Sequence, residues 1–328
     1  MPQIFSNSVW QTIRVLSIIS LISLLVLLYY NNELGLFIFW RIIIPLLPMI
    51  LFLSPGLWRN ICALSALNQT PRNFGLTKDN KLAQWIEKYS FLMAVFLFLL
   101  FVSMRKIFFN TNAYALTLLI LFLAFFALIM GIFYKGKSGW CSTFCPVMPV
   151  ERLYGQSPIF KVKNTHKDCI GCTKNCFDVC PDITFLKELY HKDQFFYNSR
   201  KFFAGIFPGF VLGFYLIPDP PQISIIQMYL SFIIYCGVSV LLLYCISYLF
   251  FKKIPGIVIS VFGVMAINFY YWFNIPMFIK IFASLDNTIT IVFVWLLRLF
   301  VFGLTILWIK KTYIKENAYI AEFLTKKK

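Results

Sequence analysis

The chain has 328 residues, of which 60% are apolar and only 13% are charged, and its formal net charge is +17. This composition excludes an ordinary soluble domain and is typical of an integral membrane protein. The cations are spread along the edges of the apolar runs and form no nucleic-acid-binding motif, so we expect anionic lipid, not nucleic acid, as their counter-charge.

Eight apolar runs are long enough to cross a bilayer, and they predict an all-α integral membrane protein. The first run is kept as a retained anchor because no signal-peptide cleavage pattern follows it. In chain order the predicted spans are 10–30, 35–57, 89–104, 113–134, 202–217, 223–251, 255–273 and 288–309.

These spans divide the chain into four regions. The predicted regions are an N-terminal four-helix membrane region (1–134), a cysteine-rich cytosolic loop (135–201), a C-terminal four-helix membrane region (202–310) and a basic cytosolic tail (311–328). With the N-terminus inside, 25 of the 30 Lys and Arg residues fall on the cytoplasmic side, as positively charged inner loops require. We therefore predict a multi-pass protein of the bacterial inner (cytoplasmic) membrane with both termini cytoplasmic.

The loop 135–201 contains six of the nine cysteines. Cytosolic thiols are kept reduced, so cysteines at this density predict metal ligation, not disulfides. Their last four read C-x-x-C-x-x-x-C-x-x-x-C-P, which is one residue longer than the ferredoxin pattern for an iron–sulfur cluster. We predict a ferredoxin-like loop that carries a 4Fe–4S cluster. The candidate metal and cofactor ligands are Cys141, Cys145, Cys169, Cys172, Cys176 and Cys180.

The sequence leaves the ligand set open. The fourth ligand of the cluster is Cys180, or else Cys145 or Cys141, because both Cys180 and Cys145 precede a proline as ferredoxin ligands do. A second cluster would need a non-cysteine ligand such as His166 or His191. The alternative function is a zinc-stabilised membrane scaffold or assembly factor without redox activity, since four thiolates also bind zinc.

The segment GWCSTFCP after the fourth span, followed by the ferredoxin-like run, resembles the NapH/NosR-type membrane iron–sulfur proteins. The segment LWRNICALSALN at 57–68 resembles that family's other Cys-Pro element after a span. Here Cys62 precedes Ala63 and has no companion cysteine, which favours a degenerate copy over a ligand. The two segments, after spans two and four, indicate a weak duplication.

The resemblance implies an electron-transfer component of a redox chain, not a stand-alone catalyst. It would link the membrane quinone pool or a redox partner protein to a downstream protein. Lysines around the predicted ligands favour docking of an acidic partner such as a soluble ferredoxin or flavodoxin. These lysines are Lys161, Lys163, Lys167 and Lys174.

Two arginines and a set of glycines lie within predicted spans. Arg298 is mid-span, where it would bind backbone carbonyls, a quinone carbonyl or a lipid headgroup. Arg41 is near the outer end of its span and is expected to reach the surface. Gly205, Gly209 and Gly213 are four residues apart and predict a close-packed helix face.

Overall fold

The computed structural model describes residues 7–78, 80–160, 186, 190, 194–250, 255–282 and 287–325. Within them the chain is helical, with no strand and one isolated bridge between Asn80 and Tyr134. The chain forms two compact units, Met1–Thr184 and Phe185–Lys328. The all-α prediction is confirmed for these residues. The boundary between the units falls inside the predicted loop 135–201.

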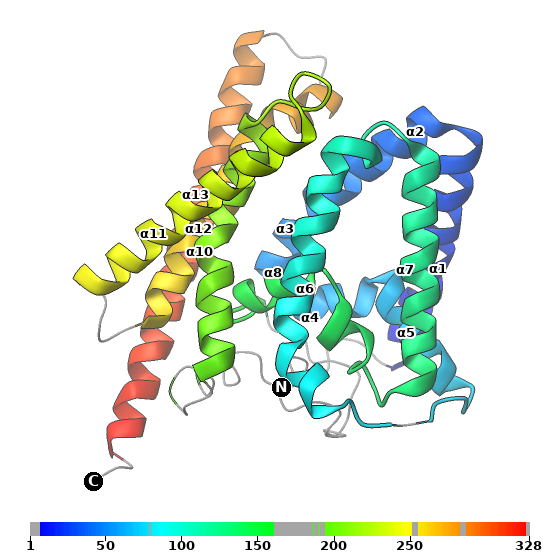
Figure 1. Cartoon of the computed structure of the whole chain (residues 1–328), viewed down its shortest axis with the longest axis horizontal. Coiled ribbons are helices and arrows are strands. Elements are labelled where there is room, and N and C mark those ends of the chain that lie inside the picture. Colours follow the sequence, from blue (N-terminus) through cyan, green and yellow to red (C-terminus); the bar gives the residue numbers. More distant parts are fainter. Residues whose placement is uncertain are drawn as a thin grey trace. The chain divides into compact units, whose positions relative to one another are not determined.

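Unit 1 (Met1–Thr184) contains paired long helices connected by shorter ones (Figure 1). Three short stretches, labelled η, have wider π-helical turns and continue or connect α-helices. In chain order the elements are α1 (Asn7–Tyr30), α2 (Asn32–Phe37), η1 (Ile38–Ile43), α3 (Ile44–Leu53), α4 (Pro55–Ile61), α5 (Ala63–Asn73), α6 (Gln84–Met104), η2 (Arg105–Phe109), α7 (Ala113–Phe133), η3 (Trp140–Phe144) and α8 (Met148–Tyr154).

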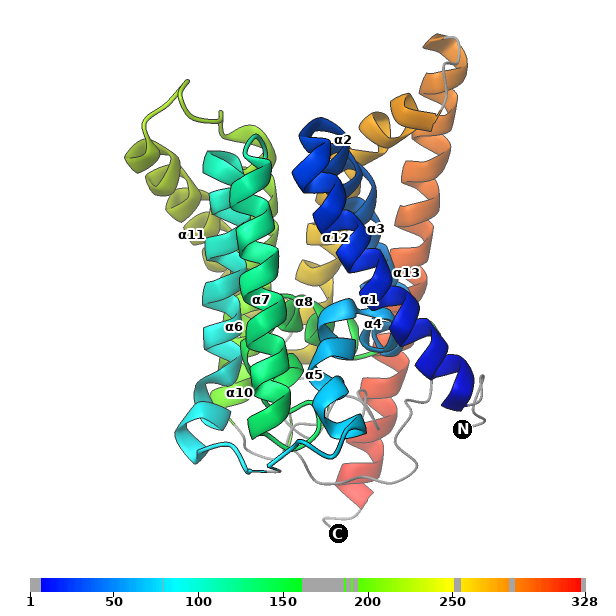
Figure 2. The same ribbon diagram turned by 90° about the vertical axis from the view of Figure 1, so that its right-hand side faces the viewer.

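Unit 2 (Phe185–Lys328) is built from long helices. In the part of the unit that the structure describes, α10 packs against both α11 and α12, and α12 packs against α13. The turned view in Figure 2 shows α13 as a rod that extends past its neighbours in this unit. These helices are α10 (Gln194–Leu216), α11 (Ile225–Phe250), α12 (Pro255–Phe282) and α13 (Asn287–Thr325).

Seven helical stretches among the described residues are long and apolar enough to cross a membrane. They correspond to seven of the eight predicted spans. The eighth, predicted at 202–217, lies in α10, which is not one of the seven because its first turns are polar and contain Arg200 and Lys201. The seven stretches are Ser8–Tyr30, Asn32–Leu53, Gln84–Phe109, Ala113–Phe133, Ile225–Leu249, Gly256–Ile281 and Thr288–Glu322.

Large apolar side chains cover the outside of several of these helices. On α11, the side chains of Ile226, Ile233 and Leu241 are 73%, 67% and 66% exposed within the chain. A soluble protein rarely exposes so much contiguous apolar surface, whereas lipid tails cover it at no cost. The exposed surface therefore supports the membrane location.

Helices approach one another closely at glycines, which have no Cβ. A Cβ at Gly131 of α7 would overlap the backbone carbonyl of Asn68 in α5, and one at Gly209 of α10 would overlap that of Tyr235 in α11. Gly205 and Gly213 also face α11 at contact distance. The predicted close-packed glycine face is thus confirmed, because small residues let helix backbones approach.

The last helix is longer than the prediction. The predicted span ends at 309, but α13 continues to Thr325 and has 39 residues. Its Glu316 is fully buried and accepts hydrogen bonds from the backbone N–H of Gly256 (2.9 Å) and from the Tyr190 hydroxyl (2.8 Å). Glu316 thereby stabilises the N-terminus of α12, where backbone N–H groups lack helical partners.

Candidate functional site

The candidate site lies in unit 1, where two short connections follow the helices α3 and α7. Cys62 is the single residue between α4 and α5, while Cys141 lies in η3 and Cys145 ends it. The predicted ligands Cys169, Cys172, Cys176 and Cys180, like His166 and His191, lie outside the described residues.

The two connections have the same local backbone form. Cys62 has φ −69° and ψ 122°, and Cys145 has φ −64° and ψ 117°, so each turns the chain sharply between two short helices. The N–H of Cys62 donates to the Trp58 carbonyl (2.9 Å) and that of Cys145 to the Trp140 carbonyl (3.0 Å). This similarity agrees with the weak duplication expected from the sequence, and it places Cys62 and Cys145 at corresponding positions.

The thiols of the three cysteines are near enough to influence one another's ionisation. Burial raises the pKa of Cys62 to about 12, and charge on Cys141 adds to the effect. Burial also raises the pKa of Cys145 well above its ordinary value, with added contributions from Cys141 and Cys62. Cys62 thus lies near Cys141, and the expectation that its segment is a degenerate copy stays a prediction.

Two buried cations, Lys137 and Arg59, lie near Cys141. Burial raises the pKa of the Cys141 thiol, but Lys137 and Arg59 act in the opposite direction and favour the thiolate. Both cations are nearly inaccessible, with 2% and 3% of their surface exposed. The two cations thus offset part of the cost that burial places on a thiolate at Cys141, whose pKa stays above its ordinary value.

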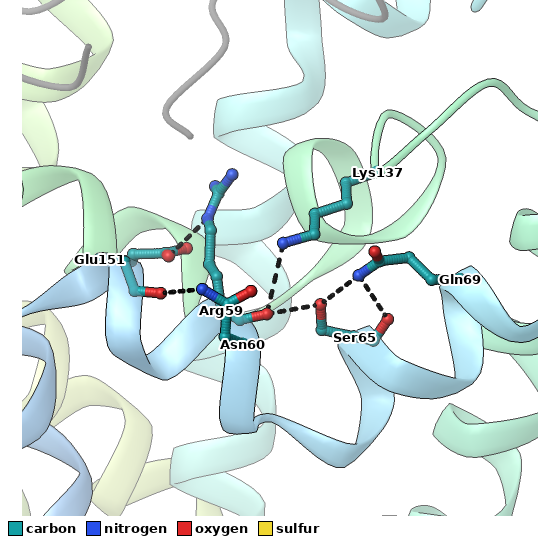
Figure 3. A network of polar contacts seen from close by, with 7 residues as sticks. Arg59, Asn60, Ser65, Gln69, Lys137 and Glu151 are labelled. Carbon is teal, nitrogen blue, oxygen red and sulfur yellow. Dashed lines mark hydrogen bonds and ion pairs between the residues drawn. The ribbon is translucent and has the colours of Figure 1, made fainter. Parts of the chain in front are cut away.

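A polar network holds these cations in place (Figure 3). Arg59 Nε pairs with Glu151 Oε1 at 2.5 Å, and both side chains are buried. Lys137 Nζ and Ser65 Oγ both donate to the backbone carbonyl of Arg59, at 3.3 and 2.9 Å. Gln69 Nε2 in turn donates to the backbone carbonyl and the hydroxyl oxygen of Ser65. The network joins α4, α5, α8 and the segment before η3, so it fixes both cysteine-bearing connections.

Apolar packing closes the site on the side of α7. Cys141 is in a core cluster with Ala127 of α7 and Trp140, and Phe126 packs edge-on against the Trp140 ring at 5.9 Å between centroids. In the described ranges, no three His, Cys, Asp or Glu side chains are arranged to hold a single metal ion. The described part of the site thus contains three thiols and two buried cations. The other four predicted ligands lie outside the described residues.

Comparison with protein-family models, curated proteins and solved structures gives no match to this chain.

Proposed function

We propose that this chain is a membrane-bound electron-transfer protein with a 4Fe–4S cluster held by its cysteine-rich loop. The observation that carries the proposal is the cysteine run of the loop, Cys169, Cys172, Cys176 and Cys180, together with Cys141 in η3 and Cys145 at its end. Six thiols within one loop are more than packing requires, and the spacing of the last four resembles the ligand run of an iron–sulfur cluster.

The residues of the chain perform two tasks in this proposal. Cys169, Cys172 and Cys176 would hold the cluster, with a fourth thiolate from Cys180, Cys145 or Cys141. Lys137 and Arg59 would offset part of the negative charge of a thiolate at Cys141, against the opposing effects of burial and Glu151. The cluster, when bound, supplies a one-electron couple. A redox partner protein or a membrane quinone would exchange electrons with it.

Anaerobic purification tests the proposal. The expected result is a brown protein with about four irons per chain, whose broad visible absorption is bleached by dithionite. Colourless protein with one zinc and no iron would overturn the redox function and favour a zinc-stabilised scaffold.

Cysteine replacements test the ligand set. Cys172→Ser should remove the iron, whereas Cys245→Ser, on the exposed face of α11, should retain it as the matched control. Cys180→Ser and Cys145→Ser should differ in iron content if one of them is the fourth ligand. Full iron retention in all three loop variants would show that the proposed ligand set is wrong.

A further inference from the structure

Unit 2 contains a cavity of about 480 Å³ between α10, α12 and α13. This volume is within the range of small-molecule sites in proteins. The lining is mostly aromatic and apolar, and it also includes Arg298 and Asn268. The lining residues that matter here are Leu212, Asn268, Trp272, Trp295, Arg298 and Val301.

Arg298 is held in the cavity wall by aromatic rings. Its guanidinium carbon is 3.8 Å from the centre of the Trp272 ring and 5.3 Å from that of Trp295. One terminal nitrogen, Nη2, donates to the backbone carbonyl of Trp272 at 2.7 Å. Nε is buried and has no hydrogen-bond partner among the described residues. A buried donor without an acceptor costs about 1–3 kcal/mol.

The charge lies deep in the membrane-spanning part of unit 2. Trp272 is about three helical turns before the end of α12, and Arg298 is about three turns after the start of α13. Three turns correspond to about 16 Å, which is close to half of a hydrocarbon core of about 30 Å. With these two helix ends at the membrane surface, phosphate headgroups would be out of reach of Arg298.

Asn268 supplies a second polar group in a fixed orientation. Its Nδ2 donates to the Val264 carbonyl at 2.9 Å and to the Thr305 hydroxyl oxygen at 3.1 Å. These two hydrogen bonds use both N–H groups of the amide nitrogen. The remaining polar atom of the side chain is the acceptor Oδ1. Arg298 and Asn268 thus give the cavity lining a cation and an amide within aromatic walls.

We propose that this cavity binds a membrane-soluble compound that presents an acceptor oxygen to Arg298. A flat conjugated head with a carbonyl oxygen fits the rings of Trp272 and Trp295, and an alkyl tail fits the apolar remainder. Alkyl quinones have this chemistry, and a fatty-acid carboxylate is a second source of the same acceptor. The binding inference depends on the cavity alone, and only a redox use of the ligand rests on the proposed function.

Binding is tested with the full-length protein in lipid nanodiscs. The probe is decyl benzoquinone, with decanoic acid and decanol as parallel arms, and the readouts are tryptophan fluorescence and the shift in melting temperature. We expect saturable binding of decyl benzoquinone and at least about tenfold weaker binding by Arg298→Gln, because a charged hydrogen bond is lost. Arg41→Gln, which removes the exposed arginine of η1, is the matched control and should bind like the wild type.

A cavity-filling variant keeps the test informative if Arg298→Gln does not fold. Val301 is buried in the lining, so Val301→Phe should block binding while Arg298 remains in place. Arginine-dependent binding of decanoic acid alone would identify the carboxylate as the source of the acceptor oxygen. Equal effects of all three probes, or unchanged binding by both variants, would overturn the site.

The two proposals fail separately. The iron-free Cys172→Ser protein should bind decyl benzoquinone as the wild type does, because Cys172 is outside unit 2. Binding without iron in the wild type would leave the cavity site intact and remove the proposed function. A protein that contains iron but does not bind decyl benzoquinone would support the proposed function and overturn the cavity site.

Discussion

The surroundings of Cys62 determine the pH at which its thiol ionises. Burial and the nearby Cys141 raise its pKa from the ordinary 9.0 to about 12. The folded protein therefore keeps this proton at pH values where the unfolded chain has lost it. The contribution of the group to stability is complete below about pH 9 and falls as the pH rises towards about 12.

Alkylation of the metal-free protein checks this shift. Iodoacetamide reacts with thiolates, so its reaction with Cys62 should be slow at neutral pH and should rise between about pH 9 and about pH 12. Peptide mass spectrometry would follow Cys62 individually, with protein unfolded in SDS as the control. Identical pH profiles for folded and unfolded protein would contradict the shift.

At the scale of helices, the contact between α5 and α7 depends on Gly131. Its Cα faces the backbone of Asn68, whose side-chain Nδ2 also donates to the Ala127 carbonyl at 3.0 Å. Ala127 is in the same core cluster as Cys141. Separation of these two helices would therefore disturb the wall of the cysteine site as well as the membrane core.

Replacement of one glycine should show this dependence. Gly131→Ala should lower stability by about 1–3 kcal/mol, because the added methyl group overlaps backbone that cannot move independently. Gly303→Ala in α13 is the matched control, since a Cβ there meets nothing within 4 Å. Thermal unfolding in detergent would measure the stability of both variants. Equal melting temperatures for Gly131→Ala and the wild type would contradict the proposed contact.

Helix positions were predictable from apolar runs, but some helix ends were not. Lys310, Lys311 and Lys315 end the apolar run of the last span, yet lysine is a good helix former, so α13 continues through them. Residue spacing likewise revealed the glycine face of α10, because that pattern is local.

Long-range contacts in the site could not be read from local patterns. Arg59 and Glu151 are 92 residues apart, and no periodicity specifies that pair. The place of Cys62 beside Cys141 also depends on how the two connections fold together. The four cysteines of the ferredoxin-like run remain a prediction, because they lie outside the described residues.

At the scale of the whole molecule, the path of α10 decides on which side the C-terminus lies. The seven apolar stretches alone would place the two termini on opposite sides, whereas an additional crossing by α10 places them together. α10 has 23 residues, packs against two neighbours and buries Phe203, Ala204 and Phe210. Its length of about 34 Å suits a crossing.

Reporter fusions distinguish these topologies. We expect a fluorescent protein fused after Lys328 to fold and fluoresce, because both termini are predicted to be cytoplasmic. Alkaline phosphatase fused after Asp219 should be active, since that turn is then outside. A fusion after Asn110 is the control, because this turn is outside in both topologies. A dark C-terminal fusion with inactive phosphatase at Asp219 would show that α10 does not cross.

The length of α13 has a mechanical consequence. One uninterrupted helix carries Arg298 in the cavity wall and, about 27 Å further along, Glu316 with its bond to Tyr190. A helix is stiff along its axis, so Arg298 and Glu316 keep a fixed separation. A shift of α13 along its axis would therefore move the cavity wall and the Glu316–Tyr190 bond together.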